Sequence, residues 1–301
     1  MPDERQGEER REKEIFKDYH ALLIGISRYK NQDDIDWTIS KIYDADRDAQ
    51  SVRDTLEAIG YPPSQIHCLF NEEATVEAIQ RKLRYLGAAW RFDFLFIFWA
   101  GHGVLDEHTR SFLLCHDTNL GDLSRTALPV DEVIHLVVHA NSAKRAIFLD
   151  TCHSSPKSAQ IFRIRWIPSD LTNNEHAMAF VGASTYLAVA QAPFGGILAT
   201  CLKEALSDCS TSPCDPEGTV YLADVINYLQ LHMRPRARAA WEKDNRRGPV
   251  PQHPYIVFLP GHDAPMGRNI PTYIRKVIDH SELPEPVKKL ASMINWKDLF
   301  R

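Results

Sequence analysis

The sequence predicts an α/β fold in which a mainly parallel, six-stranded sheet is covered by helices on both faces. Short apolar runs with the composition of buried strands alternate with longer segments whose apolar residues recur every three or four positions. Two of these runs stop abruptly at polar, reactive side chains, near residues 102 and 152. The chain of 301 residues, 44% hydrophobic and 25% charged, is also long enough to bury one large core.

Six apolar runs have the length of strands that are buried on both faces of a sheet. In chain order they are residues 21–26, 66–70, 94–99, 146–149, 177–183 and 255–259. Gly25 in the first run suits a close approach of two backbones. A further short segment, 111–116, has the character of a hairpin strand. None of these runs approaches the ~20 apolar residues that a membrane-spanning helix needs.

Between the strands, the apolar residues recur in steps of three and four, which is typical of helices with one buried face. The predicted helices are residues 42–59, 76–86, 130–140, 195–206 and 221–233. Gly60 ends the first of them, and Pro62 and Pro63 prevent its continuation. Thr75 offers an N-cap to the second helix, and Gly87 is expected to close it. Helices of this length between strands favour parallel strand pairing.

The pattern divides the chain into three regions. Residues 1–18 alternate acidic and basic side chains and form a charged arm, for which a disordered terminus is favoured over a regulatory element. Residues 19–261 contain the predicted domain. Residues 262–301 hold prolines and short amphipathic pieces and form a tail of unknown role. Within the domain, 154–176 has little periodicity and is expected to be a long loop, a feature that is usually functional.

Composition limits the possible partners and compartment. The formal charge of −5 gives no electrostatic case for nucleic acid or an anionic membrane, and mildly favours a cationic peptide substrate. No secretory signal is visible at the N-terminus, which favours the cytoplasm. Six scattered cysteines suit free thiols in a reducing compartment: Cys68, Cys115, Cys152, Cys201, Cys209 and Cys214. The last two are close enough for a metal or redox pair, but no second pair stands at zinc-finger spacing.

Two of the predicted strands end at residues that suit nucleophilic catalysis. One runs into a histidine between glycines, at 100–103, and the other into a cysteine, at 150–153. The carboxyl ends of neighbouring parallel strands face a shared crevice. A cysteine of ordinary pKa needs a nearby histidine or positive charge to raise its thiolate fraction, and His102 can supply this to Cys152. The main-chain amides of Gly103 and Cys152 are natural donors to a developing oxyanion.

Each residue taken singly has an ordinary structural explanation, a buried cysteine or a satisfied loop histidine. Taken together, His102 and Cys152 stand roughly 50 residues apart, close to the His-to-Cys separation of caspase-type proteases. His153 adjoins the cysteine, but strand alternation directs its side chain elsewhere. The pair therefore predicts a catalytic dyad.

The stretches Ala100-Gly101-His102-Gly103 and Leu149-Asp150-Thr151-Cys152-His153-Ser154 together resemble the metacaspases and prokaryotic caspase homologues. These belong to the caspase-fold clan of cysteine peptidases, and the resemblance runs from about residue 20 to residue 259. It implies a three-layer caspase-like fold, with His102 as general base or acid and Cys152 as nucleophile.

The chain departs from the commoner family wording at two positions. Ala100 stands where a serine often precedes the Gly-His pair, and Ser155 stands where a glycine often follows the His-Ser pair. The first change bears on the primary specificity pocket, and neither removes the dyad.

Asp150 lies two residues before Cys152, so in an extended strand their side chains face the same way. In metacaspases the aspartate at this position lines a pocket for a basic residue, together with an aspartate early in the first helix, which matches Asp48 here. Two carboxylates hold a guanidinium or ammonium far better than an acidic side chain. We therefore predict cleavage after Arg or Lys. The alternative for Asp48 is that it joins Asp44 and Asp46 in favouring the positive end of their helix.

Further candidate residues lie in the loops that follow the strands. By the same resemblance, Ser184 and Tyr186 lie where substrate backbone is held in an extended pose, although ordinary loop capping explains them equally well. If the specificity is basic, Lys157, Arg163 and Arg165 are candidate sites for self-cleavage or for cleavage by an upstream protease.

No metal or cofactor is predicted. His135 and His139 have a spacing at which two imidazoles can share a metal, but the metalloprotease glutamate is missing, and an ordinary helix face is favoured. Some metacaspases require calcium, and a polar loop contains three candidate ligands, Asp33, Asp34 and Asp36. Their spacing matches no known calcium loop, so calcium activation has no motif to support it.

The sequence thus predicts a cysteine endopeptidase that cleaves protein substrates after Arg or Lys through an acyl-enzyme. Family analogy suggests signalling in regulated cell death or antiviral defence, with an upstream activating protease or regulator as a partner. Two alternatives stay open. One is a catalytically inactive caspase-like scaffold or interaction module, and the other is a separase-like peptidase with another specificity.

Overall fold

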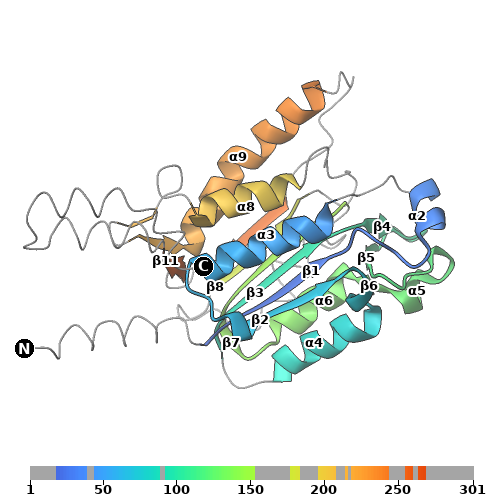
Figure 1. Cartoon of the computed structure of the whole chain (residues 1–301), viewed down its shortest axis with the longest axis horizontal. Coiled ribbons are helices and arrows are strands. Elements are labelled where there is room, and N and C mark those ends of the chain that lie inside the picture. The colour runs from blue at the N-terminus through green and yellow to red at the C-terminus, as the bar shows by residue number, and fades with distance from the viewer. Residues whose placement is uncertain are drawn as a thin grey trace, which may run out of the picture.

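A central sheet lies between two layers of helices (Figure 1). The computed structural model describes residues 18–38, 44–88, 92–152, 177–183, 196–207, 214–215, 218–243, 255–259 and 264–268. Within these ranges the architecture confirms the predicted α/β fold with a mainly parallel, six-stranded sheet. The layers matter for function because they leave the carboxyl ends of the parallel strands at one edge, where α/β proteins place their sites.

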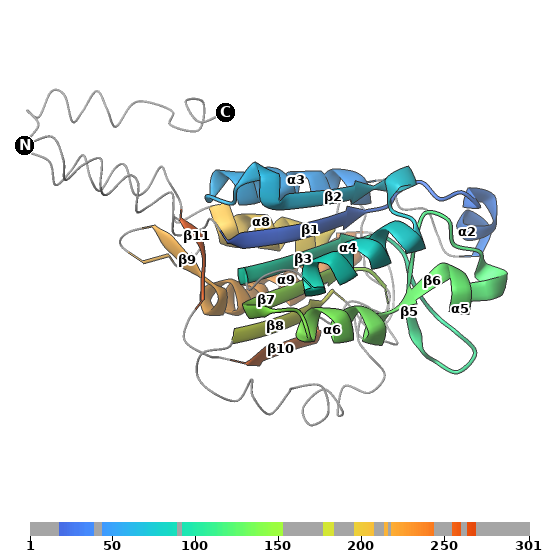
Figure 2. The ribbon, with the colours of Figure 1, turned by 90° about the horizontal axis from the view of Figure 1, so that it is seen from below.

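The six strands of the central sheet correspond to the six predicted apolar runs. They are β1 (Tyr19–Gly25), β2 (Ile66–Phe70), β3 (Phe92–Ala100), β7 (Ser142–Asp150), β8 (Ala177–Gly182) and β10 (Tyr255–Leu259). Their spatial order is β10-β8-β7-β3-β1-β2, as Figure 2 shows. The first five strands in the chain pair in parallel, whereas β10 is antiparallel to β8 at the edge. The strands β3 and β7, which end at the candidate dyad, are neighbours at the centre.

Helices cover both faces of the sheet, which explains why its strands are apolar throughout. The described α-helices are α2 (Gln32–Thr38), α3 (Ala45–Ala58), α4 (Val76–Ala88), α5 (Leu123–Thr126), α6 (Val130–Val138), α8 (Ile197–Ser207) and α9 (Leu222–Lys243). Helices α3, α8 and α9 lie over one face, and α4 and α6 over the other (Figures 1 and 2). Along β3, Phe96 and Phe98 face the first group, and Ile97 and Trp99 face the second.

Two smaller sheets flank the central one. The predicted hairpin strand is β5 (Ser111–Leu114), which lies between β4 (Gly103–Leu105) and β6 (Ala127–Pro129) in an antiparallel sheet. A second pair joins β9 (Thr219–Tyr221) to β11 (Pro265–Arg268). Strand β11 belongs to the segment 262–301, whose role the sequence left open. Because Ala264 and Met266 are fully buried in the core, this part of the segment packs on the domain.

Two helix ends differ from the sequence prediction. Helix α4 continues through Gly87 to Ala88, so Gly87 does not close it. Helix α9 extends ten residues beyond the predicted end at 233 and contains Pro235. A proline inside a helix removes one backbone hydrogen bond. Met233 and Ala237, on either side of it, are both fully buried, so tertiary packing outweighs the local preference.

The cysteines correct one expectation. No disulfide joins Cys68, Cys115, Cys152 or Cys201, as predicted. Cys214, in contrast, is disulfide-bonded, and its partner lies outside the described residues. The prediction of a free thiol is therefore wrong for Cys214, because a composition typical of reduced thiols does not prevent a single pair from forming. In the parts of the chain that the structure describes, no helix is both long enough and apolar enough to cross a membrane.

Candidate active site

The register of β3 and β7 brings the two reactive strand ends together. Trp99 is opposite Leu149, and Ala100 is opposite Asp150. Just beyond this last pair, the main-chain N–H of Gly101 donates to the carbonyl of Asp150 at 3.4 Å. His102 and Cys152 each lie two residues past the aligned pair of Ala100 and Asp150, so they occupy equivalent places at the carboxyl edge of the sheet.

Gly103 packs directly against the backbone of Cys152. A Cβ atom at Gly103 would lie 2.0 Å from the carbonyl oxygen of Cys152 and 3.3 Å from Oγ1 of Thr151. Such a distance is far below van der Waals contact, so only glycine fits at this position without a displacement of the chain. The structure therefore places Gly103 beside Cys152, as required if both amides are to face one oxyanion.

We expect Gly103→Ala to lower kcat by roughly 100-fold or more, because the added methyl group must push the Cys152 backbone away from His102. Steady-state kinetics on a peptide substrate measures the loss. Gly87→Ala is the matched control, since the nearest atom to its new Cβ would be 3.9 Å away, in ordinary contact. Equal kinetics for the two variants would contradict the close packing at Gly103.

Asp48 and Asp150 meet at the N-terminus of α8. The Ala199 N–H donates to Oδ2 of Asp150 at 2.9 Å, and the Gly196 N–H donates to Oδ2 of Asp48 at 2.6 Å. The first amides of a helix have no partner within the helix and carry its positive dipole end, so they stabilise carboxylates. The structure thus brings together the two aspartates that the sequence assigned to a substrate pocket, at one face of the sheet.

The position of Asp150 also requires a glycine at residue 196, because a Cβ at Gly196 would lie 1.8 Å from Oδ2 of Asp150. Sequence reasoning did not single out Gly196 or Ala199. The signal that points to them is a pair of glycines, at 195–196, directly before an apolar helical run. Glycines at such a place allow a side chain from another element to reach the helix amides.

Burial changes the protonation of the acidic pair. It raises the pKa of Asp150 to about 7, with the Asp48 charge adding to the effect and the Ala199 N–H opposing it. Burial likewise raises the pKa of Asp48, while the Gly196 N–H lowers it. A cation beside such a carboxyl group favours its charged form and so lowers the pKa again.

Comparison with known proteins identifies the family. The family model described as "Caspase domain" matches residues 18–247, which is more than half of the chain. The chain belongs to the caspase-domain family. It is therefore a cysteine-peptidase domain, and proteins are the substrates expected of it. This match confirms the resemblance that the strand-end motifs indicate. No curated protein sequence matches the chain.

A solved caspase structure agrees with this caspase domain in fold. Caspase-1 from Spodoptera frugiperda is 12% identical, with a TM-score of 0.51, over 84% of this chain and 91% of that one. A protein from Geobacter sulfurreducens is 16% identical, with a TM-score of 0.49, over 79% of this chain and 92% of that one. At such low identity the likeness to the insect caspase concerns the fold alone, and it confirms the caspase-like architecture.

The imidazole of the caspase domain's His102 lies against a residue that sequence reasoning missed. The main-chain N–H of His102 donates to the hydroxyl of Tyr29 at 2.9 Å, and the two rings have centroids 5.3 Å apart. Tyr29 lies in the loop after β1. Because β1 pairs with β3, an aromatic side chain just past the end of β1 is a signal that could have identified it.

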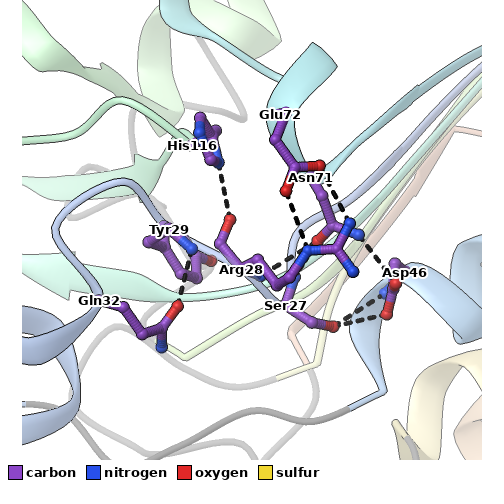
Figure 3. A network of polar contacts seen from close by, with 8 residues as sticks. All are labelled: Ser27, Arg28, Tyr29, Gln32, Asp46, Asn71, Glu72 and His116. Carbon is purple, nitrogen blue, oxygen red and sulfur yellow. Dashed lines mark hydrogen bonds and ion pairs between the residues drawn. The ribbon is translucent and has the colours of Figure 1, made fainter.

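The aspartates at the start of α3 have separate partners. Asp48 contacts α8, whereas Asp46 accepts hydrogen bonds from Ser27 and Asn71 (Figure 3). Asp44 forms an exposed ion pair with Arg47. The three do not act as one helix-end cluster, although the positive end of α3 still favours each of them.

The structure describes some of the candidate metal ligands. Asp33 and Asp34 are exposed on α2, so the predicted polar loop is a short helix and that expectation is wrong. His135 lies on α6 and His139 is the C-cap of this helix, where its Nδ1 contacts the carbonyl of His135 at 2.9 Å. Within the described ranges, no group of three or more His, Cys, Asp or Glu side chains is arranged to hold a metal ion.

Several other predicted site residues lie outside the described residues. They are Lys157, Arg163, Arg165, Ser184 and Tyr186.

Proposed function

We propose that this caspase domain is an active cysteine endopeptidase that hydrolyses protein substrates after Arg or Lys. Cys152 is the nucleophile, and His102 is the general acid and base. The observation that carries the proposal is the register of β3 and β7, which aligns Ala100 with Asp150 and so leads both reactive residues to one edge of the sheet. The contact of Gly103 with Cys152 supports it further.

The reaction follows from the residue chemistry. The Cys152 thiolate attacks the carbonyl carbon of the scissile peptide, and the amides of Gly103 and Cys152 stabilise the resulting oxyanion by about 3 kcal/mol per donor. His102, which took the thiol proton, gives it to the leaving amine as the C–N bond breaks. Water then loses a proton to His102 and attacks the thioester, which releases the acid product and restores the thiol.

Asp48 and Asp150 supply the proposed specificity. Their carboxyl groups lie on the α3 and α8 side of the sheet, and Asp150 is the last residue of β7, two positions before Cys152. A guanidinium or ammonium can replace helix amides as the partner of these carboxylates through charge-assisted hydrogen bonds. An acidic residue preceding the cut would meet two carboxyl groups and be disfavoured.

The proposed dyad is nearly buried, with His102 2% and Cys152 9% exposed. A peptide must therefore displace whatever covers these side chains before it reacts. Cleavage at Lys157, Arg163 or Arg165, in the segment after Cys152, is one way in which this could be triggered, by the enzyme itself or by an upstream protease. If mass spectrometry shows that segment 154–176 is intact in the fully active enzyme, this trigger is contradicted. A role in regulated cell death or defence rests on family analogy.

A panel of fluorogenic peptides that differ only in the residue before the cut tests the function. We expect turnover of Arg and Lys peptides and none of the Asp peptide. We also expect an arginyl acyl warhead to label Cys152, located by mass spectrometry. Turnover confined to Asp peptides overturns the specificity. Turnover confined to other residues points to a separase-like enzyme. No turnover and no labelling point to an inactive scaffold.

A further inference from the structure

We infer that Tyr29 is a positioning residue for His102, holding the main chain and the imidazole of the proposed general acid and base at the end of β3. The inference rests on the proposed function, because it assigns Tyr29 a role in the same dyad. The role is distinct from the reaction itself, since Tyr29 acts through His102 and need not touch the substrate.

The hydroxyl of Tyr29 joins two strand ends. It accepts from the His102 N–H at 2.9 Å and donates to the carbonyl of Ile26 at 3.2 Å. Gly101 permits this approach, because a Cβ there would lie 3.0 Å from the Tyr29 hydroxyl. Tyr29 is 4% exposed, and burial raises the pKa of its phenol far above the usual value. The hydroxyl therefore stays protonated and keeps both of its roles, as donor and as acceptor, at any physiological pH.

The ring of Tyr29 provides a second contact. Its centroid is 5.3 Å from that of His102, with 40° between the planes, so the tyrosine forms one wall of the imidazole site. A side chain packed in this way loses rotamer freedom. Proton transfer needs the imidazole within hydrogen-bond reach of the thiol and the leaving nitrogen. The reaction rate therefore depends on the orientation of the imidazole.

The loop that carries Tyr29 is itself held by Asn71, which follows β2 (Figure 3). Oδ1 of Asn71 accepts from the N–H groups of Ser27 and Arg28 at 2.9 and 3.0 Å, and Nδ2 donates to Asp46 at 2.8 Å. Asp46 also accepts from the Ser27 hydroxyl at 2.7 Å. Asn71 thus holds the two loop residues that precede Tyr29 and joins them to the start of α3.

Asn71 has a backbone φ of 47° and is 4% exposed. Asparagine tolerates this left-handed region better than most residues, but the conformation still costs energy and persists where the surroundings require it. Here they do, because one amide side chain satisfies two loop N–H groups and a carboxylate. The exposed ion pair of Arg28 with Glu72, at 3.0 Å, contributes little in comparison.

This network also connects the two parts of the proposed site. Asp46 lies in the first turn of α3, two residues before Asp48, which belongs to the acidic pair. The same cluster of hydrogen bonds therefore sets the Tyr29 loop on one side and the start of the pocket helix on the other (Figure 3). Tyr29 is the member of the cluster that reaches the dyad.

Tyr29→Phe tests the inference, with Tyr19→Phe as the matched control. Both tyrosines are on or next to β1 and nearly buried, and both hydroxyls donate to a main-chain carbonyl, that of Pro265 in the case of Tyr19. Tyr19 lies at the opposite end of the strand from the dyad. Both variants lose a buried hydroxyl and its hydrogen bond to a main-chain carbonyl, but only Tyr29→Phe also loses the contact with His102.

Three quantities are measured on the full chain: kcat and KM for an Arg peptide, the pH dependence of Cys152 alkylation by iodoacetamide, and the melting temperature. We expect Tyr29→Phe to lower kcat by about 10- to 100-fold with little change in KM. The alkylation profile should move to higher pH, because a misplaced imidazolium stabilises the thiolate less. Tyr19→Phe should lower the melting temperature and leave the kinetics and the alkylation profile as in wild type.

Wild-type kcat and an unshifted alkylation profile in Tyr29→Phe overturn the inference and leave the proposed function intact. A wild-type enzyme without turnover overturns the proposed function, and the inference with it. If Tyr29→Phe does not fold, Asn71→Gly carries the test, since it keeps the positive φ and removes only the amide. The same fall in kcat and the same alkylation shift support the positioning role, and their absence contradicts it.

Discussion

Cys152→Ala is expected to abolish hydrolysis of Arg peptides, with a loss of kcat on the order of 10⁶-fold, comparable to removal of the nucleophile from a serine protease. The methyl group cannot form the thioester, and the remaining oxyanion donors and pocket give only residual catalysis. The fold should tolerate the change, because Cys152 lies in the turn after β7 and alanine removes a single buried atom. A continuous fluorescence assay at high enzyme concentration measures the activity that remains.

Cys68→Ala is the matched control for this prediction. Cys68 is a free, half-buried thiol on β2, and burial raises its pKa, so it supplies little thiolate. Its replacement should leave kcat unchanged. Residual activity of Cys152→Ala within tenfold of wild type, or a comparable loss in Cys68→Ala, would show that Cys152 is not the nucleophile.

Asp150→Asn is expected to lower kcat/KM for Arg peptides by roughly 100-fold, equivalent to about 3 kcal/mol for a lost charge-assisted hydrogen bond. The amide keeps the size of the carboxyl group and can still accept from the Ala199 N–H. Only the negative charge is lost. The effect should fall mainly on KM, and an otherwise identical peptide with citrulline, the neutral relative of arginine, should lose much less.

The pKa of Asp150 makes this selectivity depend on pH. Because burial raises that pKa to about 7 in the free protein, binding a guanidinium below this pH requires loss of a proton. We expect KM for the Arg peptide, relative to the citrulline peptide, to fall as the pH rises from 5 through 7 and then to level off. Asp150→Asn should flatten this ratio. A ratio independent of pH in wild type contradicts the assignment of Asp150 to the pocket.

Stability should respond in the opposite direction. A carboxyl group with a raised folded-state pKa binds its proton more tightly in the folded protein, so its contribution to stability is present at low pH. That contribution is lost as the pH rises from about 4, the ordinary pKa of an aspartate, through about 7. Asp150→Asn should therefore melt at a higher temperature than wild type at pH 8, measured by thermal unfolding, although it is the poorer enzyme.

Much of the scaffold follows from local patterns in the sequence. The run before His102 and the run before Cys152 are continuous apolar stretches, and such stretches between amphipathic helices favour buried parallel strands wherever they occur. Strand alternation likewise predicts, without knowledge of the fold, that the side chains of Asp150 and Cys152 face the same way. These features depend on residues close together in the chain, so a single sequence is enough to predict them.

Other features depend on contacts between distant residues, and only the tertiary structure decides them. Helix α9 continues past Pro235 because the core buries both sides of the proline, and β11 finds its partner strand more than 40 positions away in the chain. Neither leaves a local signal. Long-range packing outweighs the propensities on which sequence reasoning relies.

The candidate site divides in the same way. His102 and Cys152 could be predicted as candidate site residues, because each follows the abrupt end of an apolar run. Only the contact with the N-terminus of α8 distinguishes Asp48 from the neighbouring aspartates. Only the pairing of β1 with β3 brings Tyr29 to His102. The sequence by itself therefore predicts which groups react. Their orienting partners come from other elements, which only folding brings within hydrogen-bond distance.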